Sequence, residues 1–156
     1  MFRVQNNLAG ITQNGGMLIS EALANGNNAM KEMRKPCLKT IDRLLGEMSQ
    51  KYGPAARRGD EDFQALYELS SRIIDVSGPV ADLQLDRAAF SLCELVDRCA
   101  GQSIWDWPSV DVHFDALQLL RHVGADLKAA ERKTIFDGLD RVTDRLPVAG
   151  AAPEEG

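Results

Sequence analysis

Residues 70–97 read SSRIIDVSGPVADLQLDRAAFSLCELVD, and this stretch decides which fold we expect. Apolar residues recur every three or four positions on both sides of Gly78-Pro79, a spacing typical of amphipathic helices. A Gly-Pro pair interrupts a helix, because glycine favours turns and proline has no backbone N–H to donate. The stretch therefore predicts a hairpin of two helices, at residues 60–77 and 85–101, with Gly101 as the stop of the second.

The same three-and-four spacing continues outside the hairpin. Before it, a core-facing stripe is formed by Met30, Met33, Cys37, Ile41, Leu44 and Met48. Pro36 interrupts this stripe and predicts either a kink or a fresh helix start. After the hairpin, helices are predicted at residues 108–124 and 126–146. Short connections between such helices favour antiparallel neighbours. We expect an all-α fold, namely an antiparallel four-helix bundle with an extra C-terminal helix and a short N-terminal helix.

The predicted boundaries divide the chain into three parts. Residues 1–27 form an N-terminal segment, partly loose, with a short helix at residues 17–24. Residues 28–146 form the helical bundle. Pro147 ends the last helix, so residues 147–156 are expected to be a disordered tail.

Composition narrows the classes of function. The chain has 156 residues, is 44% hydrophobic and carries a net charge of −5, which argues against nucleic acid as the main partner. No apolar run approaches the roughly 18 residues of a membrane span, and no secretory signal is visible. Cys37, Cys93 and Cys99 form no paired motif, which indicates reduced thiols in a cytoplasmic protein. No P-loop, GxGxxG, CxxC or HExxH motif is present, so neither a cofactor nor a metal is expected.

The hairpin resembles the histidine phosphotransfer domains of bacterial phosphorelays. Their signature is a His, then Lys three residues on, Gly four on and a small residue six on. Gly follows ten residues on, Leu fourteen on, and small and apolar residues eighteen and twenty-one on. Counted from Ser71, the structural half matches in residue type at Ser77, Leu85, Ala89 and Leu92, and Ala81 is a near match for Gly. The chemical half does not match, because His, Lys and Gly are replaced by Ser71, Ile74 and Asp75. The resemblance covers residues 28–124. Through LYELSSRI at residues 66–73, AAFSLCELVD at 88–97 and WPSVDVHFDALQLLR at 107–121, the chain also resembles small alphaproteobacterial proteins associated with chemotaxis or phosphorelay genes.

Helix geometry gives a separate indication of which residues face outward. At 100° per residue, Leu66, Leu69 and Ile73 fall on the core side of the predicted helix. The position of the missing His falls on the opposite side, where phosphotransfer would need it. The outer side of this helix carries Gln64, Glu68, Ser71 and Asp75. The expected binding face consists of these four residues and Ile74, which the resemblance places at the position of the signature's Lys.

The substitutions at this face change what it can do. A relay needs a nitrogen nucleophile whose phosphoramidate is labile, whereas a serine phosphate is a stable ester. A serine also needs a base, and no histidine lies within a helical turn of Ser71. The resemblance therefore implies a non-enzymatic, degenerate phosphotransfer-like protein. It would bind or regulate a receiver domain or a histidine kinase in two-component or chemotaxis signalling.

Two alternatives remain open from the residues. The first is an active phosphotransfer protein that uses His113, although its position beside Phe114 and Leu117 favours a packing role. The second is a structural helical protein that acts as a homodimer. His122 lies near a predicted helix end, where a cation is stabilised by the helix dipole. Trp105 and Trp107 either anchor a partner or, as we expect, cover one end of the bundle.

Overall fold

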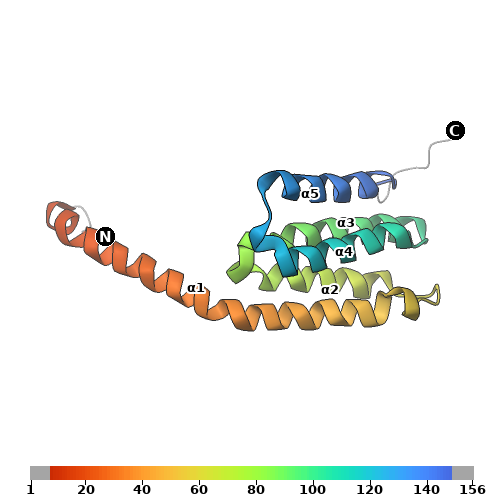
Figure 1. Cartoon of the computed structure of the whole chain (residues 1–156), viewed down its shortest axis with the longest axis horizontal. Coiled ribbons are helices and arrows are strands. Elements are labelled where there is room, and N and C mark those ends of the chain that lie inside the picture. Colours follow the sequence, from red (N-terminus) through yellow and green to blue (C-terminus); the bar gives the residue numbers. More distant parts are fainter. Residues whose placement is uncertain (1–7, 149–156) are drawn as a thin grey trace. The chain divides into compact units, whose positions relative to one another are not determined.

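The computed structural model describes the backbone of residues 8–148, and the side chains of residues 19–26 and 28–148. All regular secondary structure in residues 8–148 is helical, which confirms the predicted all-α class (Figure 1). The α-helices are α1 (Leu8–Tyr52), α2 (Phe63–Val76), α3 (Leu85–Gln102), α4 (Trp107–Val123) and α5 (Ala129–Asp144). Short 3₁₀ helices connect them at η2 (Pro54–Ala56), η3 (Gly78–Leu83) and η4 (Gly124–Asp126). The predicted tail lies outside the described residues from position 149 onward.

Helix α1 differs from the sequence prediction. It is one helix that continues through Pro36, so the separate short helix at residues 17–24 and the fresh start at Pro36 were wrong. Pro36 is exposed and follows Arg34 and Lys35, which are good helix formers, so the lost backbone hydrogen bond does not end the helix. The chain divides into two compact units between Pro36 and Cys37.

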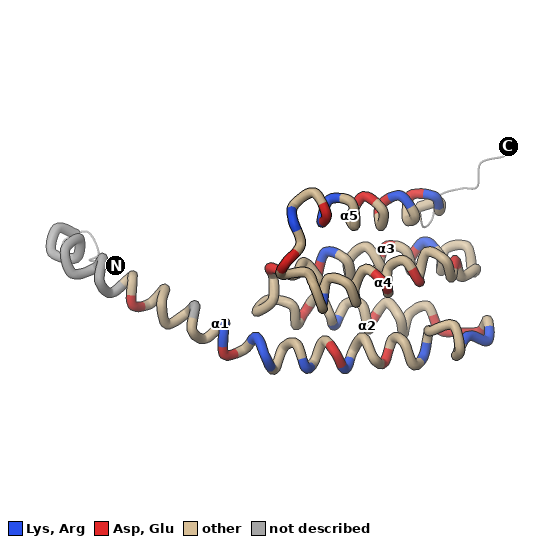
Figure 2. Tube along the Cα trace, viewed as in Figure 1, with Lys and Arg blue, Asp and Glu red and all other residues tan. Residues whose placement is uncertain are grey.

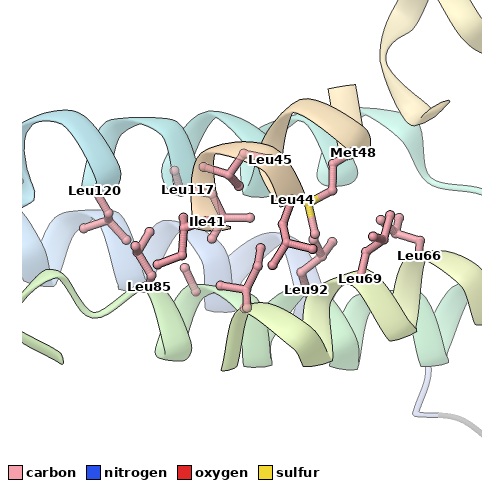
Figure 3. Close-up of a cluster of buried hydrophobic side chains, with 14 of the residues drawn as sticks. Ile41, Leu44, Leu45, Met48, Leu66, Leu69, Leu85, Leu92, Leu117 and Leu120 are labelled. Carbon is pink, nitrogen blue, oxygen red and sulfur yellow. The ribbon is translucent and has the colours of Figure 1, made fainter. Parts of the chain in front are cut away.

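The core belongs to the second unit. Ile41, Leu44 and Met48 of α1 are at most 1% exposed, as the stripe predicted. Figure 3 shows this part of α1 facing leucines of the other helices, which are Leu66 and Leu69 of α2, Leu85 and Leu92 of α3, and Leu117 and Leu120 of α4. The first two members of the predicted stripe, Met30 and Met33, are exposed instead, because they lie in the first unit, where no described residue is buried.

Helix α3 is the central element of the second unit. It packs against α2, α4 and α5. Leu85, Ala89 and Leu92, which match the phosphotransfer signature, are buried, and so are Ala88, Cys93, Leu95, Val96 and Cys99. Because α3 has neighbours on several sides, its buried surface is wider than a single amphipathic stripe.

Local hydrogen bonding moves three helix ends from their predicted positions. The Asp62 carboxylate accepts from the Gln64 N–H at 2.9 Å, so α2 begins at Phe63 instead of residue 60. Glu131 accepts from the Lys128 N–H at 2.8 Å, so α5 begins at Ala129 instead of residue 126. Helix α3 passes through Gly101 and ends at Gln102, and the next residue, Ser103, caps it with a left-handed backbone at φ 58°.

Two arginines attach the outer helices. Nη1 of Arg98 on α3 donates to the carbonyls of Thr143 and Leu146 at 2.9 Å each, which satisfies acceptors at the C-terminal end of α5. Arg121 of α4 donates to both carboxylate oxygens of Asp42 on α1, at 2.7 and 2.9 Å. The hydrogen bonds of Arg98 and Arg121 thus link helices that are distant in sequence.

Truncation of Leu92 tests the position of α3 in the core. Leu92 is fully buried, so Leu92→Ala should lower the free energy of unfolding by about 2–5 kcal/mol, measured by urea denaturation. Leu119→Ala on α4 is the control, because that side chain is 43% exposed and its loss should have little effect. Equal losses for the two variants would contradict this description of the core.

Candidate functional site

The five residues of the predicted binding face all lie on α2, but they are not equally accessible. Gln64, Glu68 and Asp75 are exposed, whereas Ser71 is half-buried. Ile74 is also half-buried and packs against the core, so it is not part of an open face. The structure therefore places three polar residues on a shared outer surface of α2, and Ser71 is partly sheltered beside them.

A shallow groove lies beside these residues, between α2 and α3. Its volume is about 260 Å³, and it is lined by Gln64 and Tyr67 from α2 and by Phe90, Cys93, Glu94 and Asp97 from α3. Phe90 is 67% exposed and Tyr67 is 39% exposed. Exposed aromatic side chains next to a groove are typical of protein contact surfaces.

Sequence analysis missed both aromatic residues. Phe90 follows two buried alanines but lies about 160° around α3 from Leu92, since each residue turns the helix by 100°. A large apolar side chain opposite the core stripe was therefore a usable signal. We refer to Gln64, Glu68 and Asp75 together with the residues lining this groove as the α2–α3 face.

The α2–α3 face is mainly acidic. Its carboxylates are Glu68, Asp75, Glu94 and Asp97, while Arg72 is the exposed cation on α2 among the described residues (Figure 2). Glu94 is paired with Arg98 at 3.3 Å, and the Glu94 side chain is still 51% exposed. The face therefore offers aromatic surface surrounded by negative charge.

The thiol of Cys93 lines the groove between α2 and α3 but is unreactive near neutral pH. It lies 3.7 Å from the Tyr67 carbonyl oxygen, to which it donates. Burial raises the pKa of this thiol to about 11. Because the thiolate is the reactive form, Cys93 is not a nucleophile near neutral pH. Cys37 and Cys99 are also buried, and the Cys37 thiol donates to the Val76 carbonyl at 2.8 Å.

His113 is fully buried, with both ring nitrogens in hydrogen bonds. Nδ1 lies 2.8 Å from the carbonyl oxygen of Ser109, which can only accept, so Nδ1 carries the proton. Nε2 then accepts from the hydroxyl of Ser91 at 2.8 Å, with Thr143 at 3.4 Å. Burial lowers the pKa of His113 below its usual value of 6.5. Its predicted packing role fits this geometry, and its lone pair is not open to a phosphodonor.

The other predicted features fall at the ends of α4. His122 is exposed in the last turn of α4, as expected for a dipole-stabilised position. Trp105 stacks on Phe63 at 4.3 Å and on Trp107 at 4.5 Å between ring centroids. The indole N–H of Trp105 donates to the Glu61 carbonyl at 3.1 Å. The two tryptophans are half-buried and pack against one end of the hydrophobic core, which fits the covering role expected for them.

A second depression lies at this tryptophan end. Its volume is about 470 Å³, and it is lined by residues 59–61 and 103–105 together with Phe63 and Trp107. The rings that line it already stack on one another, and Arg57 lies over Trp107 at 4.3 Å. The aromatic rings here already make contacts within the chain, which leaves less aromatic surface for a partner. The α2–α3 face is therefore the stronger candidate for binding.

Neither a metal site nor a membrane segment is found in the described part of the chain. Within it, no three His, Cys, Asp or Glu side chains are grouped so that they could hold a metal ion. None of its helices combines the length and apolar character that crossing a bilayer requires. No protein-family model, curated protein or solved structure matches the chain.

The pH dependence of stability tests the environment of His113. Because its folded-state pKa is lowered, its contribution to stability is complete above pH 6.5 and is lost as pH falls below that value. We expect urea unfolding between about pH 6.5 and 5.5 to show a loss of at most about 1.4 kcal/mol per pH unit from this one group.

Two variants separate His113 from other titrating groups. His113→Gln should flatten the dependence in that interval, and His122→Gln, at an exposed position, should leave it unchanged. A wild-type slope that survives His113→Gln would show that another group causes it.

Proposed function

We propose that this protein is a degenerate, phosphotransfer-like binding protein of two-component or chemotaxis signalling, located in the cytoplasm and without phosphotransfer of its own. The observation that carries the proposal is the α2–α3 hairpin. It keeps the apolar and small residues of the phosphotransfer signature, such as Leu85, Ala89 and Leu92, buried in the core. It presents Ser71, with exposed Asp75 nearby, where that signature has its acceptor histidine and glycine.

The chemistry of the acceptor position supports binding rather than catalysis. Ser71 has no histidine within a helical turn, and a serine phosphate is too stable to pass on its group. The chain contains two histidines, and both lie on α4. His113 is buried with its nitrogens engaged, so the alternative of phosphotransfer through His113 has an inaccessible nucleophile.

The α2–α3 face indicates what kind of partner surface would fit. Phe90 and Tyr67 offer apolar contact area, and Glu68, Asp75 and Asp97 surround it with negative charge. A receiver domain presents a cluster of carboxylates around its phosphorylation site. Bringing like charges together costs several kcal/mol, so this docking mode is disfavoured. We therefore propose that the partner, a kinase or receiver, presents an apolar surface flanked by lysine or arginine.

A phosphotransfer assay tests the absence of relay chemistry. The chain is incubated with labelled phosphodonor kinases and receivers from the same genome, and products are tested for acid and alkali lability. We expect no acid-labile, alkali-stable phosphate on the wild type. Ser71→Ala should behave identically and keep its fold, because a partly exposed serine contributes little to stability. An acid-labile phosphate that disappears in His113→Gln would establish the alternative instead.

Charge variants at Asp75 test the electrostatic part of the proposal. Against receiver domains, affinity should rise from wild type to Asp75→Gly to Asp75→Lys, because a repulsive carboxylate is removed and then replaced by a cation. Added salt should raise the wild-type affinity for these receivers, since it screens repulsion. Binding is measured by titration calorimetry at low and high salt. Tight wild-type binding that Asp75→Gly weakens would make Asp75 a recognition residue for a receiver.

Truncation of Phe90 tests the apolar part. For the partner that binds the wild type, Phe90→Ala should weaken affinity at least tenfold, since exposed aromatic anchors dominate such contacts. The matched control is Ile104→Ala, because Ile104 is also 67% exposed but lines the depression at the tryptophan end. A loss with the control and none with Phe90→Ala would move the contact surface to that end.

A further inference from the structure

The depression at the tryptophan end lies between two segments that border helices. Residues 59–61 lead into α2 and residues 103–105 follow α3, while Phe63 and Trp107 complete the lining. Its volume of about 470 Å³ lies within the range of sites that hold small molecules. The stacked rings leave little surface for a protein partner, but a small molecule needs only the open space beside them.

The loop that forms one wall of this depression is held by hydrogen bonds. The Glu61 carboxylate accepts from the backbone N–H groups of Arg58 and Gly59, the latter at 2.9 Å. The indole N–H of Trp105 donates to the Glu61 carbonyl at 3.1 Å, which joins the loop to the segment after α3. Gly59 has φ 100°, a backbone conformation that glycine adopts without strain. Because these walls are already fixed, a ligand would bind there without the cost of ordering the chain.

Apolar and negatively charged groups line the depression together. Ile104 is 67% exposed and offers apolar contact area. Asp60 is exposed and contributes a carboxylate. The C-terminal end of α3, next to Ser103, carries the negative end of the helix dipole, and the last turn of α3 contains no basic residue. This combination favours a ligand that is apolar in one part and positively charged in another.

Most of the neighbouring positive charge is already balanced. Arg57 donates to both carboxylate oxygens of Asp111, through Nη1 at 3.2 Å and through Nη2. The positive N-terminal ends of α2 and α4 are offset by Asp62 and Asp106, which stand at the cap positions. Arg58 is exposed in the loop and would repel a bound cation, so its removal should strengthen binding.

We propose that this depression binds a small organic cation with an apolar body. Its ammonium or guanidinium group lies beside Asp60 and the C-terminal end of α3, and its apolar part lies against Ile104. The site is separate from the α2–α3 face and does not depend on the function proposed for that face.

The tryptophans provide a direct measurement of this binding. The chain contains two, and both line the depression, so their fluorescence and their indole N–H signals in NMR report its occupancy. Hexylammonium is titrated into the full chain at neutral pH, with hexanol and hexanoate as controls of the same chain length. We expect saturable changes with half-saturation at or below about 1 mM for hexylammonium, and binding at least tenfold weaker for both controls. Added salt should weaken the binding of hexylammonium.

Substitutions separate the charged part of the site from the apolar part. Asp60→Lys should weaken hexylammonium binding at least tenfold, and Arg58→Gln should strengthen it, because each changes the charge beside the ligand. Ile104→Ala should weaken hexylammonium and hexanol alike. Asp115→Lys on α4 is the matched control, since Asp115 is exposed but does not line the depression, and it should leave binding unchanged.

Four results would overturn the proposal. The first is the absence of a saturable change up to about 10 mM hexylammonium. The second is hexanol binding as tight as that of hexylammonium, and the third is unchanged hexylammonium binding in Asp60→Lys. The fourth is a terminally blocked dipeptide of leucine and lysine that binds more than tenfold tighter than hexylammonium, which would assign the site to a protein partner instead of a small molecule.

Discussion

Close packing between α2 and α3 is the contact on which the rest of the second unit depends. Small residues permit it, since Ala88 and Ala89 on α3 and Ser70 on α2 are fully buried. The Ser70 hydroxyl donates to the Leu66 carbonyl of its own helix at 2.9 Å, and Ser77 bonds in the same way to Ile73. Each hydroxyl is therefore satisfied without a partner across the interface, so two polar residues enter the core at little cost.

The same packing explains why the outer face of α2 is only partly open. A helix that lies close to its neighbour shelters residues at the edge of its outer surface, and this applies to Ser71 and Ile74. Phosphotransfer needs an accessible nucleophile, whereas binding needs accessible area. The groove beside Phe90 supplies such area, and His113 contributes instead to the packing of α3, α4 and α5 through Ser91 and Thr143.

Sequence alone predicted the helical class and most of the core of the second unit, because apolar periodicity reports directly which side of a helix is buried. It placed Leu85, Ala89 and Leu92 correctly. Periodicity does not say what buries a stripe, which is why Met30 and Met33 were assigned to the core although they are exposed. The exact helix ends depend on single hydrogen bonds, such as that of Asp62, which propensity does not resolve. Of the candidate site, Gln64, Glu68 and Asp75 were named from the sequence. Phe90 was missed, although its place opposite Leu92 on the helix could have indicated an exposed aromatic residue.

Both ends of α3 are flanked by non-glycine residues with a left-handed backbone, Gln84 at φ 57° and Ser103 at φ 58°. This conformation costs an L-amino acid roughly 1–2 kcal/mol, a cost that glycine does not share. The Gln84 side chain accepts from Arg132 at 3.1 Å, which offsets part of its cost, whereas Ser103 ends the helix through its backbone N–H. The length of α3 is therefore set by its neighbours against local preference. Thermal stability could therefore be raised at Ser103, where a change to glycine would relieve backbone strain without altering any contact between helices.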